Sequence, residues 1–128
     1  MPKKIIHTDK APAAVGPYSQ AIVANGFVFT AGQIALSPAD RQLIDGDVQA
    51  QTRQALENLS AVLEEAGTSL DNIVKTTVFL NSMDDYAKVN AIYAEFLGEN
   101  SPARSAVAVD KLPLGALVEI EAVAVLPD

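Results

Sequence analysis

AIVANGFVFTA, residues 21–31, is the stretch that decides the fold, because it predicts a β-hairpin. Residues 21–24 and 27–31 are rich in Ile, Val, Phe and Thr, which favour strands. Between them stands Asn25-Gly26, a pair preferred in type I′ turns because both central positions need a positive φ. We therefore expect two adjacent antiparallel strands here.

On either side of the hairpin, the hydrophobic pattern changes between the period of a strand and the period of a helix. Residues 11–17 contain two prolines, which prevent a helix from continuing and place Tyr18 at the exit of a loop. The other predicted elements are a strand at 3–6, a helix at 47–66 that ends at Gly67, a strand at 73–80, a helix with capping-box spacing from Ser82 that stops at Gly98, and strands at 105–109 and 117–125.

This order of elements predicts an α+β fold, with one sheet covered by two helices on one face. The whole chain, residues 1–128, is expected to form a single domain. The other face of the sheet needs a cover, because the strand at 73–80 has apolar residues at both parities: Val74, Val78 and Leu80 against Ile73 and Phe79. A second copy of the chain is the simplest cover, since most soluble assemblies are symmetric.

Composition and charge exclude several classes of function. With 49% apolar and 20% charged residues the chain is typical of globular proteins, and its net charge of -7 disfavours binding to nucleic acid. There is no cysteine and His7 is the only histidine, so we expect no disulfide and no metal site. Because no apolar run approaches the roughly 20 residues that span a bilayer, we expect no membrane partner and a cytoplasmic location.

Arg104 is a charge at the start of a predicted strand, where apolar residues are usual. Ala106 and Ala108 share its face and leave room beside the guanidinium, whose planar donors match a carboxylate. The residues alone also fit a solvated or ion-paired arginine at a strand end.

Glu119 and Glu121 share a face of the last strand, with carboxylates about 7 Å apart along the strand axis. A partly desolvated carboxylate can act on water as a general base, but a charged pair can equally mark a solvated strand. Tyr18 can contact a ligand or pack on its loop, and Gly32 can expose backbone N–H groups or ease a bulge. His7 is expected to be exposed.

Six stretches of the chain resemble the reactive intermediate deaminases, the Rid or YjgF family of imine deaminases. They are APAAVGPYSQ (11–20), FTAGQI (29–34), IVKTTVFL (73–80), VNAIY (89–93), PARSAV (102–107) and VEIEA (118–122). The segment from the arginine motif to the glutamate motif is the most specific part of the resemblance. It implies a chorismate-mutase-like α+β subunit with a mixed six-stranded sheet, assembled as a homotrimeric barrel with a site at each subunit interface.

The resemblance also implies an activity: 2-iminobutanoate/2-iminopropanoate deaminase, hydrolysing reactive imines and enamines such as 2-aminoacrylate to 2-keto acids and ammonia without a cofactor. It implies that Arg104 holds the substrate carboxylate and that Glu119 positions or activates water, with Glu121 as a structural partner. Around this cleft the family pattern puts Tyr18, Gly32, Asn90 and backbone groups near Ala106.

Two positions depart from the family pattern: Ala106 stands where many members have Cys, and Ala31 where many have Ser. We expect activity to survive the first change, because the resemblance implies that this position acts through its backbone. The second can alter rate or substrate preference. An alternative function is a non-catalytic trimer that binds small ligands or acts as a holdase, and Glu119 discriminates between the two, because a carboxylate binder gains nothing from an acidic neighbour. A ribonuclease fits poorly with the acidic charge.

Overall fold

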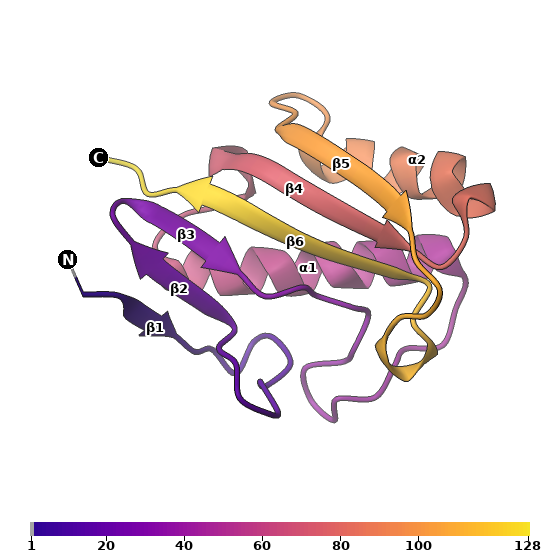
Figure 1. The fold of residues 1–128 in the computed structure, drawn as a ribbon, viewed down its shortest axis with the longest axis horizontal. Helices are drawn as coiled ribbons and strands as arrows, with labels where there is room; N and C mark the ends of the chain where they lie inside the picture. Colours follow the sequence, from indigo (N-terminus) through magenta and orange to yellow (C-terminus); the bar gives the residue numbers. More distant parts are fainter. Residues whose placement is uncertain (1) are drawn as a thin grey trace.

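Six strands form one sheet, and two helices pack against it (Figure 1). The structure is a computed structural model that describes residues 2–128. Its elements are β1 (Lys4–Ile6), β2 (Ala21–Ala24), β3 (Phe27–Thr30), α1 (Val48–Ala66), β4 (Ile73–Leu80), α2 (Tyr86–Leu97), β5 (Ala103–Ala108) and β6 (Val118–Val125). The predicted α+β class and all six strands are confirmed.

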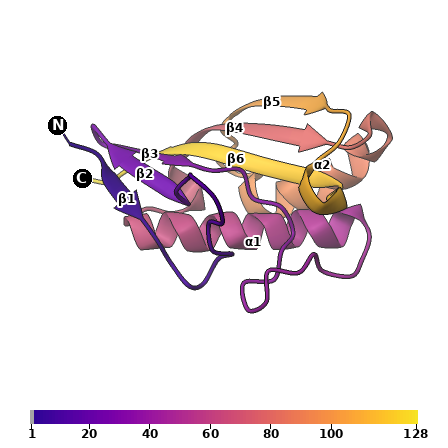
Figure 2. The same ribbon diagram turned by 60° about the horizontal axis from the view of Figure 1, so that its bottom comes forward.

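The strand order is β1-β2-β3-β6-β4-β5, so the C-terminal strand lies inside the sheet. Strands β4 and β5 are parallel and α2 connects them, as parallel neighbours require a crossover. The other neighbouring pairs are antiparallel, so the sheet is mixed as expected. Figure 2 shows both helices on the same side of the sheet, which confirms the predicted layers.

The hairpin turn has the predicted geometry. Asn25 and Gly26 have φ values of 57° and 83°, as a type I′ turn demands, and Ala24 pairs with Phe27 across it. Two strands are thereby joined by two residues.

Helix α1 supplies much of the core. Leu56, Leu59 and Leu63 are fully buried in one cluster with Val28 of β3 and Ile120 of β6. Each such side chain contributes about 1.5–3 kcal/mol of hydrophobic stabilisation on burial. This spacing of three and four residues is the pattern that predicted the helix.

The ends of the two helices differ in how well the sequence predicted them. Gly67 ends α1 in the left-handed conformation, with φ 95°, as expected. The capping role predicted for Ser82 is confirmed only in part: its side chain accepts a hydrogen bond from the Asp84 N–H at 3.1 Å, but it caps a 3₁₀ turn, Met83–Asp85, and not α2 itself. Helix α2 itself begins only at Tyr86, because this turn precedes it.

The face of the sheet opposite the helices is open, as the sequence predicted. It exposes large apolar side chains, including Ile5 (62%), Phe29 (46%) and Val107 (44%). One face assignment in β4 was wrong: Val74 was expected to share a face with Val78 and Leu80. The register shifts between Ile73 and Lys75, so Ile73 is buried and Val74 is exposed.

Within residues 2–128, none of the helices combines the length and the apolar character needed to cross a bilayer.

Candidate functional site

Arg104 lies on β5 and points toward helix α2. It pairs in register with Thr76 of β4, which is fully buried on the helix side of the sheet. Its Nη1 donates to Oδ1 of Asn90 at 2.8 Å, and its Nη2 donates to the hydroxyl of Tyr86 at 2.9 Å. The side chain is half-buried and held, not freely solvated.

Two aromatic rings also hold this guanidinium. The Cζ atom of Arg104 lies 4.8 Å from the ring centroid of Tyr93 and 5.5 Å from that of Tyr86. The Tyr93 hydroxyl is in turn hydrogen-bonded to that of Thr76 at 2.7 Å in a buried position. All these partners are neutral, and no carboxylate among residues 2–128 lies within 4.0 Å of Arg104. Its positive charge is therefore available to an anionic ligand.

Glu119 lies on β6 and points to the open face of the sheet. It pairs with Phe79 of β4, whereas the flanking Val118 and Ile120 are fully buried on the helix side. The main chain of Gln33 exchanges two hydrogen bonds with that of Ile120, at 2.8 and 3.0 Å. This bridge brings the loop after β3 alongside the carboxylate.

Gly32 lies against the Glu119 side chain. A Cβ atom at residue 32 would lie 2.7 Å from Cδ of Glu119, closer than real Cβ contacts allow. The absence of a side chain at this position lets the carboxylate lie against the loop backbone, which is a more specific reason for glycine than the predicted bulge.

Burial raises the pKa of the Glu119 carboxyl above its ordinary value of 4.5, and the negative charge of Glu121 raises it further. The two carboxylates share a face of β6, as the sequence predicted. A carboxyl with a raised pKa exchanges protons closer to neutral pH, as a general base acting on water must.

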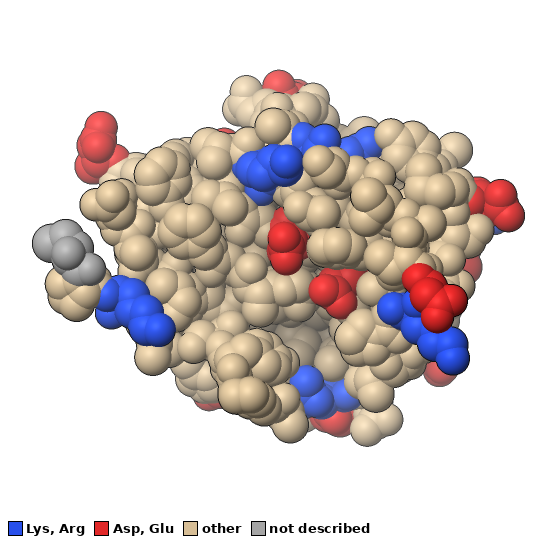
Figure 3. Space-filling model, in the orientation of Figure 1, with Lys and Arg blue, Asp and Glu red and all other residues tan. Residues whose placement is uncertain are grey.

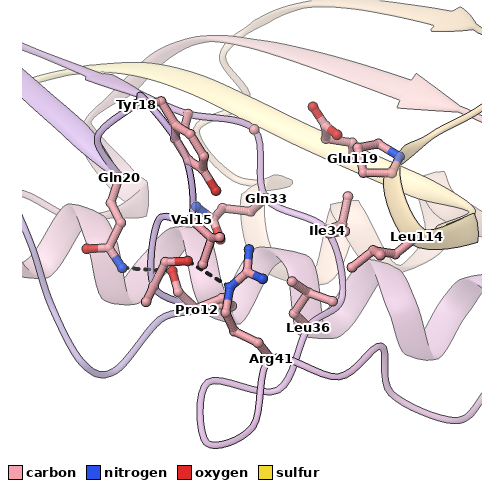
Figure 4. A pocket seen from close by; sticks show the side chains of 14 residues that line it. Pro12, Val15, Tyr18, Gln20, Gln33, Ile34, Leu36, Arg41, Leu114 and Glu119 are labelled. Atoms are coloured by element: carbon pink, nitrogen blue, oxygen red, sulfur yellow. Dashed lines mark hydrogen bonds between the residues drawn. The ribbon is translucent and has the colours of Figure 1, made fainter.

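Glu119 opens into a cavity of about 560 Å³ that also includes Tyr18 and Gly32 (Figure 4). Figure 3 shows acidic atoms near the middle of this face, beside a hollow. The cavity is lined by Pro12, Ala13, Val15, Tyr18, Gln20, Ala31, Gly32, Gln33, Ile34, Leu36, Arg41, Pro113, Leu114 and Glu119. Its walls are mainly apolar, with a few polar groups, as is usual for small-molecule sites.

The predicted site residues fall into two groups in one chain. Tyr18, Gly32 and Glu119 meet in the cavity, whereas Asn90 and Arg104 meet between β5 and α2. Ala106 lies on the Arg104 strand, two residues along, in register with buried Val78. His7 is exposed as expected and contacts Asp9.

Sequence reasoning missed Tyr86, Tyr93 and Arg41. The two tyrosines are four and three residues from Asn90, so helical spacing placed all three on one side of α2. Arg41 lies in an irregular loop, where no periodic pattern could have pointed to the cavity.

Comparison with known proteins gives matches over almost the whole chain. The sequence model of the family described as endoribonuclease L-PSP matches residues 8–126. A RutC family protein of Synechocystis is 58% identical, over 99% of both chains. The 2-iminobutanoate/2-iminopropanoate deaminase of Mus musculus is 47% identical, over 96% of this chain and 91% of its own.

A solved structure extends the comparison to three dimensions. The crystal structure of Escherichia coli TdcF with bound serine matches with a TM-score of 0.91 and 43% identity, covering 97% of this chain and 99% of TdcF. Sequence and backbone similarity therefore extend through both groups of site residues.

Proposed function

Because the chain belongs to the YjgF/Rid family, also described as the endoribonuclease L-PSP family, we propose that it is a 2-iminobutanoate/2-iminopropanoate deaminase. It would hydrolyse 2-imino acids, and enamines such as 2-aminoacrylate that tautomerise to them, to 2-keto acids and ammonia. The deaminase name of the mouse relative supports this choice of reaction.

The observation that carries the proposal is the environment of Glu119. Its carboxyl lies in a mainly apolar cavity, in contact with Gly32, and burial raises its pKa. A site that only bound carboxylates would be weakened by this acidic group. A site that hydrolyses an imine needs a proton acceptor for the attacking water.

In the proposed reaction, Glu119 takes a proton from water as the water oxygen bonds to the C=N carbon, and it passes this proton to the imine nitrogen. Glu119 then takes the hydroxyl proton of the resulting carbinolamine and gives it to the amino nitrogen, so that the C–N bond breaks, the carbonyl forms and ammonia leaves. One water is consumed and one ammonia released for each 2-keto acid. An imine conjugated to a carboxylate is already electrophilic, so orientation and proton transfer suffice without a cofactor.

Arg104 is proposed to hold the substrate carboxylate. Its hydrogen bonds to Asn90 and Tyr86 and its packing on Tyr93 support this role, because they orient the guanidinium without neutralising it.

Residues on both sides of the sheet complete the proposed site. Tyr18 is proposed to close the cavity over the substrate. The Gly32 backbone is proposed to contact the substrate beside Glu119. Asn90 orients Arg104, and backbone groups at Ala106 orient substrate and water.

The proposed site forms between copies of the chain, in a homotrimer of single-domain subunits. Arg104 points to the helix side of the sheet and Glu119 to the open side, so one chain does not present both to one small substrate. The exposed apolar residues of the open face, such as Phe29, support its burial against other copies. We propose that this enzyme acts in the cytoplasm.

The direct test measures the lifetime of an imine. A threonine dehydratase generates 2-iminobutanoate in situ, and its decay is followed alone, with the protein, with Arg104→Ala and with Arg53→Ala. Arg53 is an arginine on α1 paired with Glu95, so it serves as a matched control. We expect faster decay with the protein and the control only; equal decay in all four would reject the deaminase.

Two other functions are less well supported. A ligand-binding trimer fits the serine bound by TdcF, but it leaves the Glu119 carboxylate without a role. A ribonuclease, which the family description suggests, would need basic groups along a phosphate path. The chain has a net charge of -7, and its Lys and Arg atoms lie in separated patches around acidic ones in Figure 3.

A further inference from the structure

Arg41 brings a second guanidinium into the Glu119 cavity, on the loop between β3 and α1. Its Nε donates to the backbone carbonyl of Ala13 at 2.8 Å. Figure 4 shows the end of the side chain directed into the cavity beyond this bond. One nitrogen thus anchors the group, and the other two remain for a ligand.

The surroundings of those two nitrogens lack a counter-charge. Among residues 2–128, Nη1 and Nη2 of Arg41 have no hydrogen-bond acceptor, and no carboxylate lies within 4.0 Å. Ile34, Leu36 and Leu114 line the same cavity. A half-buried guanidinium beside apolar side chains is poorly solvated. A ligand whose carboxylate oxygens accept hydrogen bonds from it would therefore stabilise it strongly.

The backbone at Arg41 is also unusual. Its φ of 57° is in the left-handed region, which residues other than glycine rarely adopt. Asn25, Arg41 and Leu114 are the non-glycine residues with positive φ in the described chain, and Arg41 and Leu114 both line this cavity. Strained backbone concentrates at ligand sites, where the surrounding structure maintains it.

We propose that Arg41 forms a second carboxylate subsite, which makes dicarboxylic 2-imino acids the preferred substrates. This inference rests on the proposed function, in which Arg104 of a neighbouring copy holds the carboxylate next to the imine. Arg41 then binds the carboxylate at the end of the substrate side chain. A cavity of about 560 Å³ is in the size range of small-molecule sites and accommodates a five-carbon dicarboxylate.

The first experiment compares two imines that differ in side-chain charge. Amino-acid oxidases generate 2-iminoglutarate and 2-iminobutanoate in situ, with catalase present, and semicarbazide competition gives kcat/KM for each. We expect the protein to prefer 2-iminoglutarate and Arg41→Gly to reduce the ratio of the two kcat/KM values about 10- to 100-fold, the range of a charge-assisted hydrogen-bonded pair.

The variants separate charge from structure. Glycine adopts a φ of 57° without strain, so Arg41→Gly removes the cation at a position where folding should tolerate it. Arg41→Lys keeps the charge but lacks the planar fork, and should retain part of the preference. Arg53→Met removes an exposed arginine on α1 and should leave the ratio unchanged.

A binding measurement distinguishes failure of the subsite from failure of the proposed function. Calorimetry with 2-oxoglutarate and 2-oxobutanoate compares the same two side chains without any turnover. A preference for 2-oxoglutarate that Arg41→Gly abolishes supports the subsite even if no imine is hydrolysed. Equal losses for both ligands would instead make Arg41 a structural residue or the holder of the shared carboxylate. That result, or absence of a dicarboxylate preference in both assays, overturns the proposal.

Discussion

Arg104 and Glu119 lie on opposite faces of the same sheet. Arg104 is in register with Thr76, which is buried under the helices, and Glu119 is in register with Phe79 on the open side. If both groups act on one small substrate, they must come from different copies of the chain.

Mixed assemblies test this arrangement. Arg104→Ala and Glu119→Gln should each lower kcat/KM about 100-fold or more, because orientation and proton transfer are lost separately. Refolded together in equal amounts, the variants should recover about a quarter of wild-type activity, since half of the sites receive an intact arginine and half of those an intact glutamate. A mixture no more active than the average of its parents would mean that both residues act within one chain.

The support of Arg104 by neutral partners predicts effects on substrate binding. Tyr86→Phe removes one acceptor of the guanidinium, and Asn90→Leu removes the other. We expect KM for 2-iminobutanoate to rise about 10-fold for each, since a hydrogen bond to a charged group contributes about 1.5–3 kcal/mol. Steady-state kinetics measure this. Exposed Lys88→Met on α2 is the control, and a fall in kcat alone would contradict the positioning role.

The buried pair of Thr76 and Tyr93, which supports Arg104, also predicts an effect on stability. Thr76→Val leaves the buried Tyr93 hydroxyl without its partner at 2.7 Å. Urea unfolding should show a loss of about 1–3 kcal/mol. The double variant Thr76→Val/Tyr93→Phe should regain part of that loss, because no buried hydroxyl then remains unpaired. Additive losses would show that the pair contributes little.

Local patterns predicted the elements better than their relations across the sheet. Asn25-Gly26 fixed the turn because both residues accept positive φ, and Gly67 ended α1 for the same reason. The sequence also showed that Glu119 shares a face with Glu121. It did not show that Arg104 faces the other way, because face assignment between strands depends on pairing register.

The positions of loop residues and the register shift in β4 could not be predicted, because neither leaves a periodic pattern in the sequence. The register shift after Ile73 puts Val74 on the opposite face from the one that strict alternation predicts, and nothing in the apolar pattern of β4 indicates this shift. Arg41 reaches the cavity only because a loop distant from Ala13 in sequence folds back on it. Such contacts follow from tertiary packing and not from local preference.

The raised pKa of Glu119 predicts how stability depends on pH. Burial makes the folded protein hold this proton more tightly than the unfolded chain, so the stability due to the protonated form is complete below pH 4.5 and is lost as the pH rises through the higher folded-state pKa. Glu119→Gln cannot lose a proton there. The difference in unfolding free energy between Glu119→Gln and the wild type should therefore shift in favour of the variant as the pH rises from 4.5 to neutrality.

Urea unfolding at fixed protein concentration, at unit steps from pH 4 to pH 8, measures this difference. Glu57→Gln removes an exposed carboxylate from α1 and should show no comparable gain. A constant difference between Glu119→Gln and the wild type would show that the carboxyl titrates alike in the folded and unfolded chains.

The contact between Gly32 and Glu119 predicts non-additive kinetics. A methyl group at residue 32 would overlap the carboxylate, so Gly32→Ala must displace the Glu119 side chain. We expect kcat/KM for 2-iminobutanoate to fall about 10- to 100-fold while circular dichroism shows a folded protein, because small displacements of a catalytic group cost this much. In Gly32→Ala/Glu119→Gln the glycine substitution should add little to the loss caused by Glu119→Gln alone, since the carboxylate that the methyl group would displace is already gone. Losses that multiply would mean that the methyl group impairs the site without acting through Glu119.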